Sequence, residues 1–248
     1  MKRGQVSVFL IVALIVIAGI VSFFIFRDKS ELIGDNDKIF IYNNIDSCIN
    51  SVSSEGVYFL GMQGGYYDVP SPRQNYSYIY IPKYYDEGEI NIPKNKEVEE
   101  ELTKFINNNL ALCLNDFKNI KNNGYEVTSG DLSSDVSISN DYVDFSINYP
   151  LSFKKGDFVY NYKTFSKRLD LPLGNGIFLS KQLIDEQNKD ASSFPTGFLI
   201  KTADENKFFF EIIPLDNNQN IINFVFNKES ERPFVFSFII KNGGNNNE

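Results

Sequence analysis

The chain has 248 residues, with 24 Lys and Arg against 32 Asp and Glu, so its formal net charge is −8 and it contains no histidine. This balance excludes a typical nucleic-acid binder, which needs clustered Lys and Arg for the phosphate backbone. Without histidine the chain lacks the usual general base near neutral pH and the commonest zinc ligands. Aromatic residues make up 15% of the chain, too many for a disordered polymer. We therefore expect a folded, non-enzymatic protein without a metal or cofactor.

The most distinctive segment is an uncharged apolar run over residues 6–26, preceded by Lys2 and Arg3. A helix needs about 20 apolar residues to cross a bilayer, so residues 1–27 are predicted to contain a transmembrane anchor that contacts the membrane through residues 6–26. The run ends in bulky residues, Phe23 to Phe26, which do not suit the small-residue cleavage site of a secretory signal. A buried core helix is the alternative, but a core helix normally has a polar stripe.

The first residues, Lys2-Arg3-Gly4-Gln5-Val6-Ser7, have a basic pair, a glycine and a polar residue directly before the apolar run. This order resembles the class III signal of archaeal type IV pilin-like proteins, and the rest of the chain is similar to membrane-anchored proteins of archaea. The resemblance covers about the first 27 residues and implies that a prepilin peptidase cuts between Gly4 and Gln5. Pilins usually carry a glutamate at the fifth mature position, where this chain has Phe9, and that difference puts filament assembly in doubt.

Two further features favour a single-pass protein of the cell membrane with its C-terminal domain outside. Asn75-Tyr76-Ser77 is a glycosylation acceptor sequence. Cys48 and Cys113 lie on the apolar faces of two predicted helices, where they are either two reduced core thiols or a disulfide. We predict the disulfide, because disulfides are stable outside the cell.

The remaining chain is predicted to be an α+β ectodomain of two main helices and an antiparallel sheet. Apolar residues at helical spacing predict helices near 44–60, 96–121 and 179–189, and alternating patterns predict strands near 76–81, 125–128, 136–139, 142–149, 158–171, 208–213, 221–226 and 234–240. The predicted organisation is a stalk at 28–43, a region of helices and sheet at 44–155, a mainly β region at 156–241 and a disordered tail at 242–248.

Tyrosines are concentrated between residues 66 and 85, and tyrosine offers a large amphipathic contact area. They either pack a sheet against the helices or form a binding surface for glycans or proteins. The candidate binding residues are Tyr66, Tyr67, Tyr76, Tyr78, Tyr80, Tyr84 and Tyr85. The acidic run Glu97 to Glu101 is interpreted as the first turn of a helix rather than a catalytic or calcium site.

These observations favour a membrane-anchored structural or interaction protein of the cell envelope. Its expected partners are envelope proteins, glycans or like subunits, and no nucleic acid. The second hypothesis is a minor pilin-like subunit of a type IV filament, suggested by the first seven residues. The third is a hydrolase of envelope polymers, which would need paired carboxylates or a Ser–Lys contact such as Ser180 with Lys181 or Ser166 with Lys167.

Overall fold

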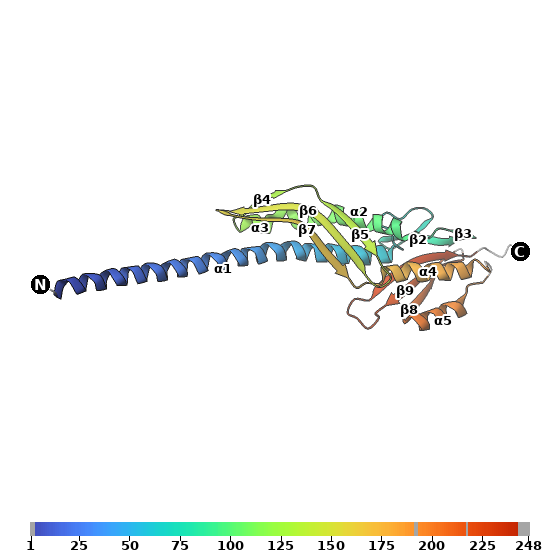
Figure 1. Ribbon diagram of the computed structural model, residues 1–248. Helices are drawn as coiled ribbons and strands as arrows, with labels where there is room; N and C mark the ends of the chain where they lie inside the picture. Colours follow the sequence, from blue (N-terminus) through green and yellow to red (C-terminus); the bar gives the residue numbers. More distant parts are fainter. Residues whose placement is uncertain (1–2, 191–192, 217, 243–248) are drawn as a thin grey trace, which may run out of the picture.

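Helix α1 (Arg3–Met62) runs without interruption along the computed structural model, and the rest of the chain gathers around its C-terminal part (Figure 1). The structure describes residues 3–190, 193–216 and 218–242, and within α1 it describes the side chains of residues 15–18, 20–22 and 36–62. The chain has no proline before Pro70, so nothing in this stretch removes a helix hydrogen bond. Residues 28–43, where a stalk was predicted, are therefore part of the same helix as residues 44–60.

The predicted transmembrane anchor has to be corrected. Across the described part of the chain, no helix combines the length and the apolar character required to cross a bilayer. This finding contradicts the fold prediction of a single membrane-spanning helix over residues 6–26, and with it the single-pass cell-membrane localisation. The apolar run instead opens a helix of 60 residues that continues through residues 27–37, six of which are charged.

Helix α2 (Asn95–Leu114) packs along the C-terminal part of α1. Its buried stripe has the spacing expected of an amphipathic helix and consists of Val98, Leu102, Ile106, Leu110 and Leu114. The helix was predicted to reach about residue 121. It stops at Leu114, because Asn115, Asp116 and Phe117 have φ values of 45°, 52° and 56° and form a 3₁₀ turn (Asn115–Phe117) before helix α3 (Lys118–Asn122).

A four-stranded antiparallel sheet covers one side of α1. It comprises β4 (Glu126–Ser129), β5 (Ser133–Ile138), β6 (Val143–Lys155) and β7 (Phe158–Leu169). The long strand β6 pairs with β5 and β4 along one edge and with β7 along the other. Its alternate residues from Val143 to Phe153 are buried, so one face of the sheet packs on the helices.

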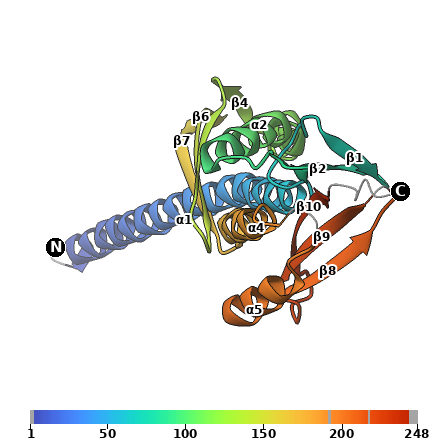
Figure 2. The same cartoon turned by 90° about the vertical axis from the view of Figure 1, so that its right-hand side faces the viewer.

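The second sheet has six strands and lies around the end of α1 (Figure 2). It comprises β1 (Arg73–Tyr76), β2 (Ile79–Asp86), β3 (Glu89–Ile90), β8 (Phe209–Pro214), β9 (Gln219–Phe226) and β10 (Phe234–Lys241). The order is β1-β2-β10-β9-β8, with β3 on β2, and β10 runs parallel to β2. The prediction of a purely antiparallel sheet is therefore wrong for this pair. The parallel arrangement arises because about 150 residues connect β2 to β10, whereas hairpins connect antiparallel neighbours.

Two further helices, α4 (Leu173–Gln187) and α5 (Thr196–Asn206), connect the two sheets in sequence. The fold is thus α+β; α4 overlaps the short helix predicted near 179–189, whereas α5 was not predicted. One continuous core joins α1, α2, α4 and both sheets, and a small second cluster of isoleucines lies on the six-stranded sheet. Gly61 allows α1 to approach β10, because a Cβ at this position would lie 2.6 Å from the Val235 carbonyl oxygen.

Candidate interaction surfaces

The part of α1 beyond the body carries exposed apolar side chains. We call residues 15–22 the projecting segment. The large apolar side chains described there are 51–65% exposed, and they are Ile15, Val16, Ile17, Ile20 and Val21. Successive residues turn by about 100° around a helix, so these side chains surround it instead of forming one stripe. Figure 1 shows no other element beside this part of α1, so a partner would have to enclose the segment from several sides.

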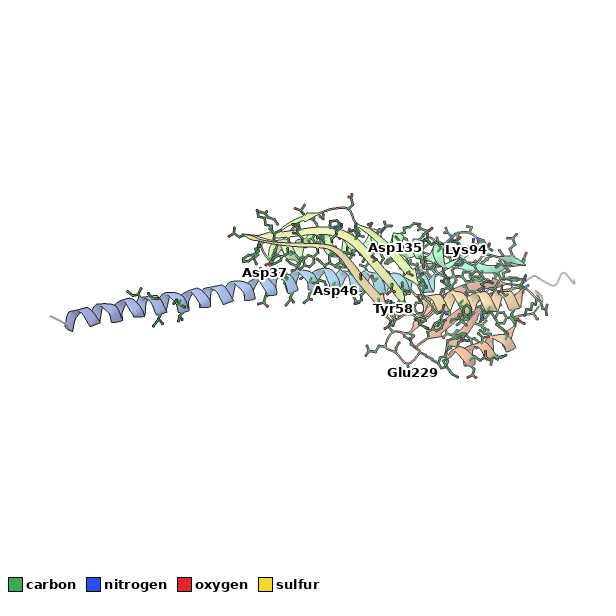
Figure 3. The ribbon with its side chains drawn as sticks, in the orientation of Figure 1. Asp37, Asp46, Tyr58, Lys94, Asp135 and Glu229 are labelled. Atoms are coloured by element: carbon green, nitrogen blue, oxygen red, sulfur yellow. A yellow bond between two sulfur atoms is a disulfide. The ribbon has the colours of Figure 1, made fainter. Side chains whose placement is uncertain are left out.

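The body begins at Asp37, which Figure 3 labels near the tip of the four-stranded sheet. The Lys155 ammonium group lies 3.9 Å from the Asp37 carboxylate, and the Tyr162 hydroxyl donates a hydrogen bond of 3.2 Å to the Lys38 carbonyl oxygen. Ile41 and Ile45 are fully buried directly after this point. The covered part of α1 therefore begins within about one helical turn of Asp37, where the β6–β7 hairpin reaches the helix.

Cys48 and Cys113 form a disulfide, as predicted, with their Cα atoms 5.7 Å apart. It joins the covered part of α1 to the last turn of α2. Cys113 is exposed and Cys48 is half-buried. A cavity of about 190 Å³ beside the bond is smaller than the roughly 300 Å³ at which ligand pockets begin. The arrangement is that of a structural clamp between two helices.

The predicted tyrosine surface is divided among three environments. Tyr84 and Tyr85 are fully buried, and the Tyr84 hydroxyl donates a 2.7 Å hydrogen bond to the Gly64 carbonyl oxygen. Tyr66 and Tyr67 are half-buried against the main core. The structure brings together only the tyrosines of the β1–β2 hairpin at the surface, and these are Tyr76, Tyr78 and Tyr80.

The three hairpin tyrosines lie next to one cation and one candidate modification site. The Arg73 guanidinium lies 4.2 Å from the centre of the Tyr80 ring, a cation–π contact. Asn75, the predicted glycosylation acceptor, is an exposed residue of β1. Ser77 and Tyr78 form the turn, with Ser77 at a φ of 57° and Tyr78 fully exposed. The hairpin therefore presents a mixed aromatic and polar edge to solvent.

The acidic run at the start of α2 has local structural roles. Glu97 accepts a 2.8 Å hydrogen bond from the Lys94 backbone N–H, which caps the helix start. Glu101 accepts the backbone N–H groups of Tyr67 and Asp68 at 2.9 and 2.7 Å. Burial raises the pKa of nearby Tyr66 to about 12, and the carboxylates of Glu97 and Glu101 add to this shift. The acidic run of the sequence therefore holds the loop that follows α1 against helix α2.

A bidentate ion pair fixes the β9–β10 loop to α1. The Arg232 guanidinium donates to both Glu55 carboxylate oxygens, at 2.8 and 3.0 Å, and lies 3.9 Å from the centre of the Tyr58 ring. The hydrogen bond from Arg232 holds the pKa of Glu55 below its usual value. Both side chains are more than half exposed, so the pair positions the loop and contributes little to stability.

Strand β8 forms a further candidate surface, one that was not predicted from the sequence. It is an edge strand of the six-stranded sheet, and Phe209 and Ile212 are exposed on it. A cavity of about 350 Å³ opens where β8 begins, between the end of α5 and the strand. Its lining residues are Ala203, Asp204, Lys207, Phe208, Phe209 and Phe210. The sequence feature that could have indicated this surface is the apolar run Phe208 to Ile213, which contains a single charged residue, Glu211.

The structure also describes the residues of the predicted processing site. Gly4 and Gln5 lie in the first turn of α1, whereas Lys2 and residues 243–248 of the predicted tail lie outside the described residues. Within the described ranges, no group of three Asp, Glu or Cys side chains is arranged to hold a metal ion.

Comparison with protein-family models, with curated proteins and with solved structures found no match for this chain.

Proposed function

We propose that this protein is a non-catalytic structural subunit, pilin-like in its design, that assembles with other copies of itself through the projecting segment of α1. The observation that carries the proposal is the set of apolar side chains on all sides of that segment. A helix that is apolar all round is normally buried. Packing against the same segment of several other copies buries all of its sides.

Burial of the projecting segment supplies free energy for assembly. Burial of one Ile or Val side chain contributes about 1.5–3 kcal/mol relative to leaving it in water. Five such side chains are described on the projecting segment, from Ile15 to Val21. Helix association also costs several kcal/mol of translational and rotational freedom. A bundle of several copies buries more of this apolar surface than a single partner does, so a bundle is favoured over a pair.

Two further features support a structural role. The disulfide between Cys48 and Cys113 fits an oxidising environment outside the cytosol, where assembled surface structures are found. The first seven residues resemble the start of archaeal type IV pilin-like proteins. In that family the helix after the cleavage site is the assembly element, so the resemblance and the exposed apolar segment favour the same function.

The described side chains also favour a protein without catalysis. Ser180 donates its hydroxyl to the Ile177 carbonyl oxygen, and neighbouring Lys181 forms an ion pair with Asp185 at 2.7 Å. These two residues are therefore occupied by helix contacts and do not form a Ser–Lys pair. Among the described residues, the carboxylates with a lowered pKa owe the shift to basic partners at the surface: Glu55 to Arg232, Glu87 to Lys241 and Asp144 to Arg168.

The test compares two substitutions of equal exposure on the same helix. Ile17 and Ile39 are both 57% exposed, but only Ile17 lies in the projecting segment. We expect wild-type protein and Ile39→Glu to sediment as concentration-dependent assemblies. Ile17→Glu should shift the association midpoint at least ~30-fold to higher concentration, because a buried unpaired carboxylate costs more than 2 kcal/mol. Assembly that survives Ile17→Glu would contradict the proposal.

The pilin-like design also includes processing. We propose that a peptidase cuts between Gly4 and Gln5, in the first helical turn, where helix ends fray most easily. Intact-mass measurement of protein from its native host should give a chain that begins at Gln5. A native chain that still begins at Met1 would contradict the proposed processing. Assembly through the projecting segment is tested separately, by the sedimentation experiment.

A further inference from the structure

Two edges of the six-stranded sheet have no partner strand among the described residues. They are β1 at one end of the strand order and β8 at the other. Sheet edges are usually protected by several charges, proline or a bulge. Strand β8 has one charged residue, Glu211, and its only proline is its last residue, Pro214. It is therefore an edge that can accept another strand.

The backbone groups that β8 offers can be identified from its hairpin with β9. The Leu215 N–H donates to the Gln219 carbonyl oxygen, so Leu215 faces β9. Because residues of an antiparallel strand alternate in direction, Phe210 and Ile212 turn their N–H and C=O groups to the open edge. On β1, the Pro72 carbonyl oxygen accepts the Lys83 N–H, so Arg73 and Asn75 turn theirs outward.

The strand directions decide how a second copy would fit. Strand β1 is antiparallel to β2, β2 is parallel to β10, and β9 is antiparallel to both β10 and β8. Strands β2 and β8 therefore run in the same direction, and β1 runs in the opposite one. A second copy added in the same orientation places its β1 antiparallel to β8, in the arrangement with the better hydrogen-bond geometry.

We propose that β8 of one copy pairs with β1 of the next, so that the sheet continues from molecule to molecule. Only one register uses both outward residues of each strand: Phe210 opposite Asn75, and Ile212 opposite Arg73. Each of these pairs exchanges two backbone hydrogen bonds. The interface differs from the one on α1 and adds a lateral contact to the proposed function.

The side chains opposed by this register are compatible. Phe209 comes to lie opposite Tyr76, and both rings are exposed in the single chain. Aromatic pairs across strands stabilise antiparallel pairing. Glu211 comes to lie opposite the Gln74 amide, so no like charges face each other. In contrast, pairing of two β8 strands centred on Glu211 would bring two carboxylates together.

The same register also provides an occupant for the cavity at the start of β8. It places the hairpin turn, Ser77 and Tyr78, opposite Phe208 and Lys207, which line that cavity. Tyr78 is fully exposed in the single chain and is the most prominent side chain of the hairpin tip. A cavity of about 350 Å³ is large enough for one aromatic ring, and buried tyrosines often anchor interfaces.

A contact between two different edges is head-to-tail, so it builds an open chain of copies instead of a closed dimer. The experiment uses two variants, Phe209→Cys and Tyr76→Cys, which are mixed and oxidised. The native cysteines are already paired, so each variant has one reactive thiol. Both also carry Ile17→Glu, so the result does not depend on assembly through α1.

We expect the mixture to give at least ~10-fold more disulfide-linked heterodimer than a control mixture of Phe209→Cys with Leu112→Cys, because pairing raises the effective thiol concentration. Leu112 is exposed on α2, away from both edges. Ile212→Pro should reduce the yield to the control level, because it removes an outward N–H without breaking the β8–β9 ladder. The matched variant Ile212→Thr keeps this N–H, so it should leave the yield unchanged. Equal yields in the two mixtures, a predominance of Phe209→Cys homodimer, or an unchanged yield with Ile212→Pro would overturn the proposal.

Discussion

The two parts of helix α1 have similar apolar residues and opposite surroundings. In the covered part, Ile41, Ile45 and Ile49 are at most 2% exposed, whereas in the projecting segment Ile15 and Ile17 are 65% and 57% exposed. Both parts belong to one unbroken helix. The covered part packs its isoleucines on the rest of the chain, whereas the projecting segment is apolar on several sides and has no other element beside it (Figure 1). One part has its partner within the chain, and the proposed function gives the other part its partner in neighbouring copies.

The largest expected effect concerns the disulfide, which ties the covered part of α1 to α2. It closes a loop of 65 residues, and the chain-entropy model gives about 4 kcal/mol for a loop of this length. We expect the double variant Cys48→Ala/Cys113→Ala to lose about this much free energy of unfolding in urea. A loss below ~1 kcal/mol would show that α1 and α2 are held together by packing alone.

The next effect compares one residue from each part of the helix. Ile45→Ala should lower the free energy of unfolding by about 2–5 kcal/mol, because it removes a fully buried side chain and leaves a cavity. Ile17→Ala should change the stability of the dispersed protein by less than ~0.5 kcal/mol, since its side chain is exposed there. Equal losses in the two variants would contradict the distinction between covered and projecting parts.

A smaller effect tests how closely the end of α1 approaches β10. Gly61→Ala places a methyl group 2.6 Å from the Val235 carbonyl oxygen, so we expect a loss of about 1–3 kcal/mol, measured by urea unfolding. Gly197→Ala is the matched control, because a Cβ there meets no atom within 4 Å. A tolerated Gly61→Ala would mean that α1 lies farther from the sheet.

The smallest effect is a dependence on alkaline pH. The pKa of Tyr66 is raised to about 12 in the folded protein, whereas an unfolded tyrosine ionises near 10. The unfolded state therefore loses this proton first, so the contribution of Tyr66 is complete below pH ~10 and declines as the pH rises toward 12. We expect Tyr66→Phe to lose less stability than wild type between pH 8 and pH 11. An identical decline in both proteins would argue against the shift.

Local patterns predicted much of the fold. The alternation in residues 142–149 and the apolar runs after residue 208 correspond to β6, β8, β9 and β10. The stripe of α2 and the disulfide between Cys48 and Cys113 were also predicted. The strands and the stripe of α2 follow from periodicity, and the two cysteines fall on the apolar faces of their predicted helices, which can be read from one sequence.

The remaining features depend on contacts between distant residues. Residues 28–37 are polar and contain Gly34, which suggested a stalk, but one glycine costs only about 1 kcal/mol in a helix and no proline is present. The early end of α2 requires three consecutive left-handed residues, Asn115 to Phe117, none of which is glycine. The parallel β2–β10 pair and the open edge of β8 follow from topology, so single-strand patterns could not indicate them.

The most direct test of the central claim is a spin label on each part of α1, attached at Ile20→Cys or at Ile39→Cys. Both sites are more than half exposed in the single chain, so both labels should be mobile in dilute protein. As the concentration rises, we predict that the label at residue 20 becomes immobilised and couples to labels on neighbouring copies, while the label at residue 39 stays mobile. A label at residue 20 that remains mobile in the assembled protein would contradict the account.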